Sequence, residues 1–83
     1  AQDYPGARAK YEEALAGLPA ESQAPVLRAI ANSWYAQGDV DQAVATFDRA
    51  LALQPDDTEL LQAVVNVLVA AGREAEAEAY LAR

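Results

Sequence analysis

Few residues of this chain have the types and spacing that catalysis or metal binding requires. The 83 residues include no histidine and no cysteine, so the commonest general base and all thiolate metal ligands are missing. Adjacent carboxylates occur at Glu12–Glu13 and at Asp56–Asp57. General acid–base catalysis needs such groups to face each other in a shielded pocket, whereas these pairs fall at helix ends or on a predicted solvent-facing surface. We therefore expect no enzyme activity and no metal site.

Nucleophiles and phosphate-binding loops are equally scarce. Ser22 and Ser33 have no histidine that could activate them, and the chain has neither a glycine-rich phosphate loop nor an EF-hand loop. We expect no cofactor. The alternative that the segment is an accessory domain of a larger enzyme stays open.

The charge balance argues against nucleic acid as a partner. Six basic and thirteen acidic residues give a net charge of −7, and binding to phosphates relies on clustered Lys and Arg. Here the basic residues are scattered and form no stripe. The acidity either serves solubility or favours a basic or neutral partner surface.

No segment is expected to span a membrane. A spanning helix needs roughly 20 consecutive apolar residues, and the longest apolar-rich stretch, Ala63 to Ala71, is interrupted by Asn66. No signal peptide is visible, and the compartment is not indicated. The chain does not start with methionine, as we expect for a domain cut from a longer protein.

Hydrophobic spacing predicts an all-α chain with a repeat. The residues of one predicted helix follow the i, i+3, i+4, i+7 pattern of a buried face, and the pattern returns 34 positions later. A fixed period of this size is typical of a repeat array. Five helices are predicted, near 3–16, 24–37, 40–53, 58–71 and 74–83. The matched positions are Leu27, Ile30, Ala31 and Trp34 with Leu61, Val64, Val65 and Leu68, and Ala43 and Phe47 with Ala77 and Leu81.

The same pattern extends upstream with a different offset. Ala7, Tyr11, Ala14 and Pro19 precede equivalent residues, Ala43, Phe47, Ala50 and Pro55, by 36 positions. We therefore expect about two extra residues in the first connection, near Ser22 and Gln23.

Helix-end signals agree with these limits. Gly38 can adopt the left-handed conformation that ends a helix. Asp39 can then cap the next helix, with Gln42 at capping-box spacing. After the break at Pro55, Asp56 and Glu59 offer a second cap of the same kind.

These residues resemble a tetratricopeptide repeat, whose pattern is W-x2-L-G-x2-Y, then A-x3-F, then a small residue and P. Residues 24–57 match a complete repeat, through the positions given above and Gly38. Residues 1–21 match the second helix of a partial repeat, and residues 58–83 a nearly complete one. The resemblance implies an α-α superhelix, a solenoid of antiparallel helix hairpins with about five helices. Val65 departs from the pattern, which has a small residue there, so we expect the hairpin of the third unit to pack less closely.

The resemblance also implies a function, namely a protein–protein interaction scaffold. The first helix of each repeat lines a concave face, which would receive a peptide or helix of a partner protein. Arg28 and Asn32 resemble part of the carboxylate clamp of some family members, but Ala63 and Glu59 stand where further clamp residues would be. The ligand-facing candidates are Arg28, Asn32, Tyr35, Gln62 and Asn66.

Self-association is the alternative. The end helices each lack a neighbour that a longer array would supply, so apolar faces at the two ends could form a homodimer.

Overall fold

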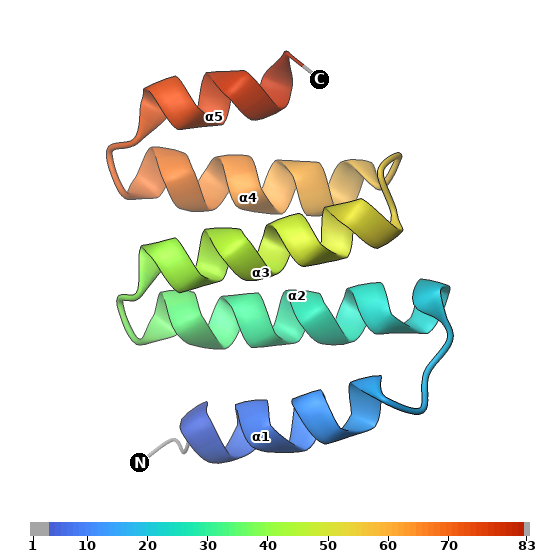
Figure 1. Cartoon of the computed structure of the whole chain (residues 1–83). Coiled ribbons are helices and arrows are strands. Elements are labelled where there is room, and N and C mark those ends of the chain that lie inside the picture. The colour runs from blue at the N-terminus through green and yellow to red at the C-terminus, as the bar shows by residue number, and fades with distance from the viewer. Residues whose placement is uncertain (1–3, 83) are drawn as a thin grey trace.

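Five α-helices make up the fold. The computed structural model describes residues 4–82, and no β-strand occurs among them. The helices lie side by side along the stack in chain order, joined by short turns (Figure 1). They are α1 (Tyr4–Leu15), α2 (Ala20–Ala36), α3 (Val40–Leu53), α4 (Thr58–Ala70) and α5 (Glu74–Leu81).

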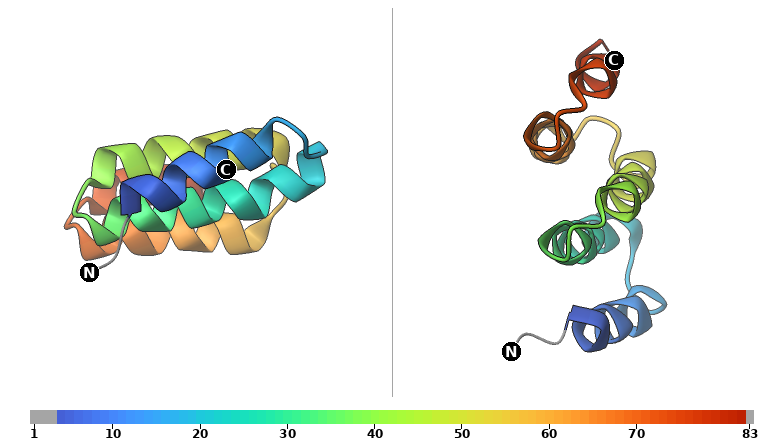
Figure 2. Two further views of the ribbon diagram at one scale, coloured as in Figure 1. Left: turned by 90° about the horizontal axis from the view of Figure 1, so that it is seen from below. Right: turned by 90° about the vertical axis from the view of Figure 1, so that its left-hand side faces the viewer.

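The helices form two layers. Seen along the helix axes, α2 and α4 lie on one side, and α1, α3 and α5 lie on the other (Figure 2). We call the outer surface of α2 and α4 the first-layer face. Each helix contacts its neighbours in sequence, and the most extensive contact is between α2 and α3. The predicted all-α superhelix of helix hairpins is confirmed.

The two inter-helix turns at Gly38 and Gly72 have the same geometry. Their φ angles are 85° and 77°, in the region that glycine adopts without strain. The amide of Asp39 donates to the carbonyl of Trp34 at 3.0 Å, and the amide of Arg73 donates to that of Leu68 at 2.8 Å. This is the helix-ending arrangement expected for a glycine after the last turn.

One predicted cap is confirmed in part and the other is wrong. The Asp39 carboxylate accepts from the amide of Gln42 at 3.1 Å. The reciprocal half of a capping box cannot form, because the amide of Asp39 already donates to Trp34. At α4 the cap is Asp57, which accepts from the amides of Glu59 and Leu60 at 3.0 and 3.2 Å. Asp56 lies one residue too early, in the turn, because α4 begins at Thr58.

The first connection also differs from its prediction. The extra residues near Ser22 and Gln23 do not lengthen the connection, because α2 begins at Ala20 rather than at 24 and includes Pro25. The amides of Ser22 and Gln23 donate to the carbonyl of Pro19 at 2.9 and 3.0 Å. The Gln23 side chain then donates to the carbonyls of Leu15 and Leu18 at 3.2 and 2.7 Å. It thus bridges the last residue of α1 and the connection that follows it.

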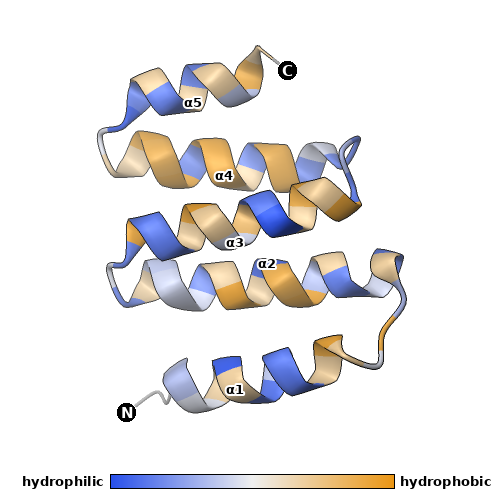
Figure 3. Ribbon diagram, viewed as in Figure 1, coloured by the Kyte–Doolittle hydropathy of each residue, from blue (hydrophilic) through white to orange (hydrophobic). Residues whose placement is uncertain are grey.

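A single core runs through the stack between the layers. Phe47, Ala43 and Ala31 are 0% exposed, as expected for small and large residues that interlock at a helix contact. Orange, apolar residues dominate α4, which has neighbours on two sides (Figure 3). The clustered core residues are Leu15, Ala24, Leu27, Ile30, Ala31, Phe47, Ala50, Leu51, Leu60, Val64, Val65, Val67, Leu68, Ala77 and Tyr80.

Three predicted core positions are less buried than expected. Trp34 is only partly buried, because it lies at the end of α2 and one face of its ring is covered by Arg8. Leu61 is also partly buried, and its neighbour Leu60 takes the core position at 2% exposure. Leu81 is 62% exposed, whereas Tyr80 is buried. Leu81 has no following helix among residues 4–82 to cover it.

The upstream counterparts of the α3 core residues are also exposed. Tyr11 is 39% exposed, and Ala14 is exposed as well. The buried residues of α1 are instead Arg8 and Leu15, seven positions apart on the side that faces α2. The apolar face with Tyr11 and Ala14 therefore has no helix packed on it among the described residues.

The α4–α5 contact is smaller than the α2–α3 contact. However, α5 has 8 residues and α3 has 14, so this difference does not isolate an effect of Val65. The predicted loosening at Val65, which is 7% exposed, stays a prediction.

Candidate functional site

The first-layer face has a shallow hollow between α2 and α4. Its volume is about 450 Å³, and five of its six lining residues are polar. Of the five candidate residues, Arg28, Gln62 and Asn66 line it. The full lining is Arg28, Thr58, Glu59, Gln62, Ala63 and Asn66.

Helical spacing explains why these side chains meet. Thr58, Gln62 and Asn66 follow one another at i, i+4 and i+8 along α4, which places them on one face of that helix. Arg28 reaches the same hollow from α2. The buried stripes of α2 and α4 point into the core, so the polar residues beside them are left on the first-layer face.

Two polar contacts order the hollow. A guanidinium nitrogen of Arg28 lies 3.5 Å from a carboxylate oxygen of Glu59, so α2 and α4 are joined across it. The Gln62 amide donates to the Asn66 side-chain oxygen at 2.9 Å. Both pairs are exposed, so each contributes little to stability and each can exchange its partner for groups of a ligand.

The ion pair between Arg28 and Glu59 affects the resemblance to a carboxylate clamp. Glu59, which stands where a clamp would have a cation, is the residue that pairs with Arg28. A partner carboxylate would have to compete with Glu59 for that guanidinium. The hollow is therefore suited to backbone amides and side-chain hydroxyls of a partner, which its own amides can bind.

The other two candidates lie outside this hollow. Asn32 lines a second hollow, between α1 and α2. Tyr35 is 39% exposed and lines neither of the two. One repeat later, Val69 takes the position of Tyr35 and is 50% exposed. Tyr35 and Val69 thus add an apolar pair to the end of the first-layer face.

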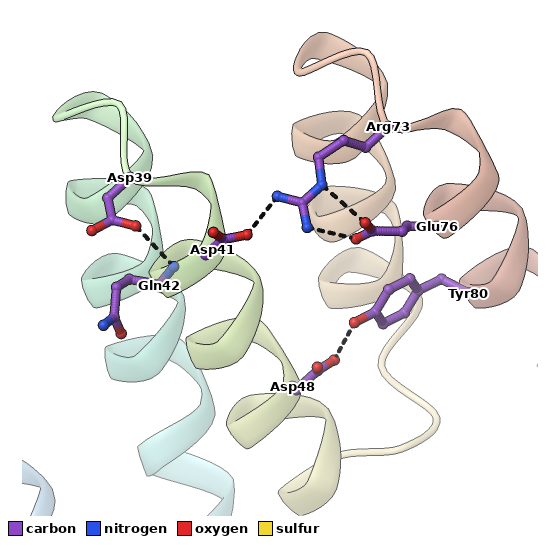
Figure 4. Close-up of polar contacts among 7 residues, drawn as sticks. All are labelled: Asp39, Asp41, Gln42, Asp48, Arg73, Glu76 and Tyr80. Carbon is purple, nitrogen blue, oxygen red and sulfur yellow. Dashed lines mark hydrogen bonds and ion pairs between the residues drawn. The ribbon is translucent and has the colours of Figure 1, made fainter.

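Contacts between alternate helices hold the second layer together, and the sequence analysis missed them. Arg73 pairs with Asp41 at 2.8 Å and with Glu76 at 2.9 Å. The Tyr80 hydroxyl donates to Asp48 at 2.5 Å. Figure 4 shows these contacts joining α3 to the start and the body of α5. Hydrogen bonds to Asp41 and then to Glu76 raise the pKa of Arg73, so it stays charged.

A second missed feature joins α1 to α2. Arg8 is only 9% exposed, and its guanidinium carbon lies 3.6 Å from the centre of the Trp34 ring, as in cation–π contacts. It also donates to the Ser33 hydroxyl at 3.2 Å and to the Gln37 side-chain oxygen. The seven-residue spacing of Arg8 and Leu15 was the available signal, but an arginine does not count as apolar in a hydrophobic pattern.

Among residues 4–82, no group of His, Cys, Asp and Glu could hold a metal ion. None of the five helices has the length and apolar character that crossing a membrane requires.

Comparison with known proteins supports the repeat architecture. A family model described as tetratricopeptide repeat matches residues 1–66 and residues 35–83, so the two matches overlap and together cover the chain. Comparisons with curated proteins and with solved structures found no significant match. The glycine turns, the two layers and the matching family model lead to one conclusion: the chain belongs to the tetratricopeptide repeat family.

Proposed function

We propose that this chain is a protein-binding scaffold whose first-layer face receives a peptide or helix of a partner protein. Tetratricopeptide repeats generally mediate protein–protein interactions and are typically non-catalytic. The proposal that a particular face does so here rests on one observation: the hollow between α2 and α4 is lined by polar side chains that are not needed for packing.

The amides of Gln62 and Asn66 are the main binding groups in this proposal. Asn32 occupies the position of Asn66 one repeat earlier, so the two asparagines offer hydrogen-bonding groups in the same register on successive first-layer helices. Side-chain amides both donate and accept, so they can pair with the backbone of an extended partner. Tyr35 and Val69 add apolar contact beside them.

Arg28 sets the orientation of the partner. Its side chain is 46% exposed, and among residues 4–82 its one ion pair is with Glu59. A partner side chain that accepts hydrogen bonds would displace or share that contact, since a guanidinium has five donors. Glu59 disfavours a strongly acidic segment at this point.

The test uses a partner peptide selected from a phage-displayed random library against the whole chain. Replacing Asn32 and Asn66 together with Ala should weaken binding of that peptide by roughly tenfold or more, since each loses a hydrogen-bonding group. The melting temperature should stay the same, since both side chains are exposed. Gln42→Ala, on the exposed side of α3, is the control and should leave the affinity unchanged.

If the double variant binds the peptide as well as the wild-type chain while remaining folded, the first-layer face is the wrong surface. An equal loss in Gln42→Ala would also count against the proposal, because it would point to a non-specific effect.

Self-association is a second candidate, favoured by one observation. Leu81 on α5 is 62% exposed, so the α5 end presents apolar surface that a second chain could cover. Light scattering on a dilution series tests this. A mass that doubles with concentration and returns to the monomer value in Leu81→Glu supports it, and a constant monomer mass refutes it.

A further inference from the structure

The first-layer face has a charged end and an uncharged end. α2 and α4 run in the same direction (Figure 1), so their first turns lie at one end of the face and their last turns at the other. The charged residues of the two helices are Glu21, Arg28 and Glu59, and each lies between the start and the midpoint of its helix. From Ala29 and from Leu60 onward, the two helices carry no charge.

The charged end is acidic on balance. Arg28 is the one cation of α2 and α4, and it already pairs with Glu59 at 3.5 Å. Glu21 lies seven positions before Arg28, two turns away on the same side of α2. Asp56 and Asp57 lie just before the start of α4, at the same end. A positive group of a partner is therefore attracted to this end, and a negative group is repelled.

Glu59 is the carboxylate of this end that lines the hollow between α2 and α4. Its side chain is 81% exposed, whereas that of Arg28 is 46% exposed. A carboxylate has about four acceptor sites, so a cation from the solvent side can share Glu59 with Arg28 rather than displace it. The hollow can therefore bind a Lys or Arg side chain through Glu59.

The opposite end of the face is apolar. Tyr35 lies two turns beyond Arg28, and Val69 lies two turns beyond Gln62. Both side chains are exposed, by 39% and 50%. An apolar side chain of a partner would remove their surface and its own from water.

The wall between the two ends favours an extended segment over a helix. Gln62 and Asn66 offer amide groups along the hollow, and an extended segment has free backbone groups to pair with them, whereas a helix bonds its own. Because a helix rises about 1.5 Å per residue, Glu59 and Val69 lie about 15 Å apart along α4. An extended chain rises about 3.3 Å per residue and covers that distance in about four or five residues.

We propose that the first-layer face binds an extended segment of a partner protein in which a Lys or Arg lies about four or five residues from a bulky apolar residue. The basic side chain lies against Glu59, and the apolar one lies against Tyr35 and Val69. This inference rests on the proposed function, because it states the chemistry of the partner that the same face takes.

The test starts from a peptide selected from the random library against the wild-type chain. The selected peptides should carry a Lys or Arg at the stated spacing, and a selection without it would overturn the inference. One such peptide is labelled with fluorescein and made in two forms, the basic peptide as selected and an acidic peptide in which Glu replaces that Lys or Arg. In fluorescence anisotropy, the wild-type chain should bind the basic peptide at least about fivefold more tightly, because an attraction becomes a repulsion.

Glu59→Arg should reverse this order, because two guanidinium groups then face the peptide. The substitution leaves the α4 cap in place, since Asp57 accepts from the backbone amide of Glu59. Glu78→Arg is the matched control, because it makes the same change of charge at an exposed position of α5, in the other layer. It should keep the wild-type order. Circular dichroism checks that both variants fold.

Two results of this comparison would overturn the inference. One is an order in Glu59→Arg that is the same as in the wild-type chain. The other is a reversal in Glu78→Arg as well, because net charge alone would then explain the preference.

The double variant with Asn32→Ala and Asn66→Ala separates this inference from the proposed function. If it weakens both peptides while Glu59→Arg leaves their order unchanged, the inference alone fails. If it binds both peptides as tightly as the wild-type chain does, the proposed function fails and the inference fails with it.

Discussion

Ala43 offers the sharpest test of the packing between α2 and α3. It is 0% exposed and lies on the most extensive helix contact of the chain. Ala43→Leu adds three carbon atoms at a position that is fully buried. Overpacking of this kind costs about 1–3 kcal/mol. Since 1 kcal/mol corresponds to roughly 4–8 °C in a domain of this size, the melting temperature should fall by at least about 4 °C.

The control is Ala45→Leu, two residues further along α3 on its exposed side. Leucine and alanine have similar helix propensities, so this variant should melt close to the wild-type temperature. Thermal unfolding followed by circular dichroism measures both. An Ala43→Leu variant that melts with Ala45→Leu would refute the close helix contact that we derive from the alanine.

Four further substitutions test a turn, a hydrogen bond between helices and a cap, each by thermal unfolding. Gly38→Ala should cost about 1 kcal/mol through backbone strain, because the φ angle is 85° while no neighbouring atom blocks a methyl group; an unchanged melting temperature would contradict the turn geometry. Tyr80→Phe removes the hydrogen bond to Asp48 and should cost about 1 kcal/mol; a change below about 0.3 kcal/mol would show that this contact contributes little. Asp57→Ala should cost about 1 kcal/mol through loss of the α4 cap, whereas Asp56→Ala should cost much less. If Asp56→Ala proved the more destabilising of the two, Asp56 would be the cap of α4, as the sequence predicted.

The fold was predictable because its determinants are local or periodic. Gly38 and Gly72 mark the two tight turns, and the 34-residue spacing relates α2 to α4. Helix limits inferred from these signals agree with the structure within a few residues, except at α2. There the sequence analysis placed the helix start just before Pro25, but a proline is tolerated early in a helix. The Gln23 side chain also donates to one carbonyl at the end of α1 and one in the following connection, contacts that no local pattern encodes.

The errors in the core have a common cause. Periodicity shows which face of a helix is apolar but not what packs on that face. Tyr11 and Leu81 match buried Phe47 in the repeat, yet both are exposed, because no described helix covers them. Arg8 shows the opposite error, because it is a charged residue that is buried. It contacts the Trp34 ring and two polar side chains of α2 and the following turn, and these contacts can be known only from the tertiary structure.

The candidate site was predictable in outline only. The positions beside the core stripe placed Arg28, Gln62 and Asn66 on one hollow. The division into two hollows, with Asn32 in the one between α1 and α2, follows from the packing of the helices and not from the repeat length.

The most direct test of the scaffold proposal is to map the bound peptide on the chain. Two-dimensional NMR spectra of ¹⁵N-labelled protein, titrated with the library-selected peptide, report which amides change environment. If the first-layer face binds the peptide, the largest chemical-shift changes should cluster on the outer side of α2 and α4, around Asn32, Gln62 and Asn66. Shifts concentrated on the outer side of α3 and α5 would contradict it.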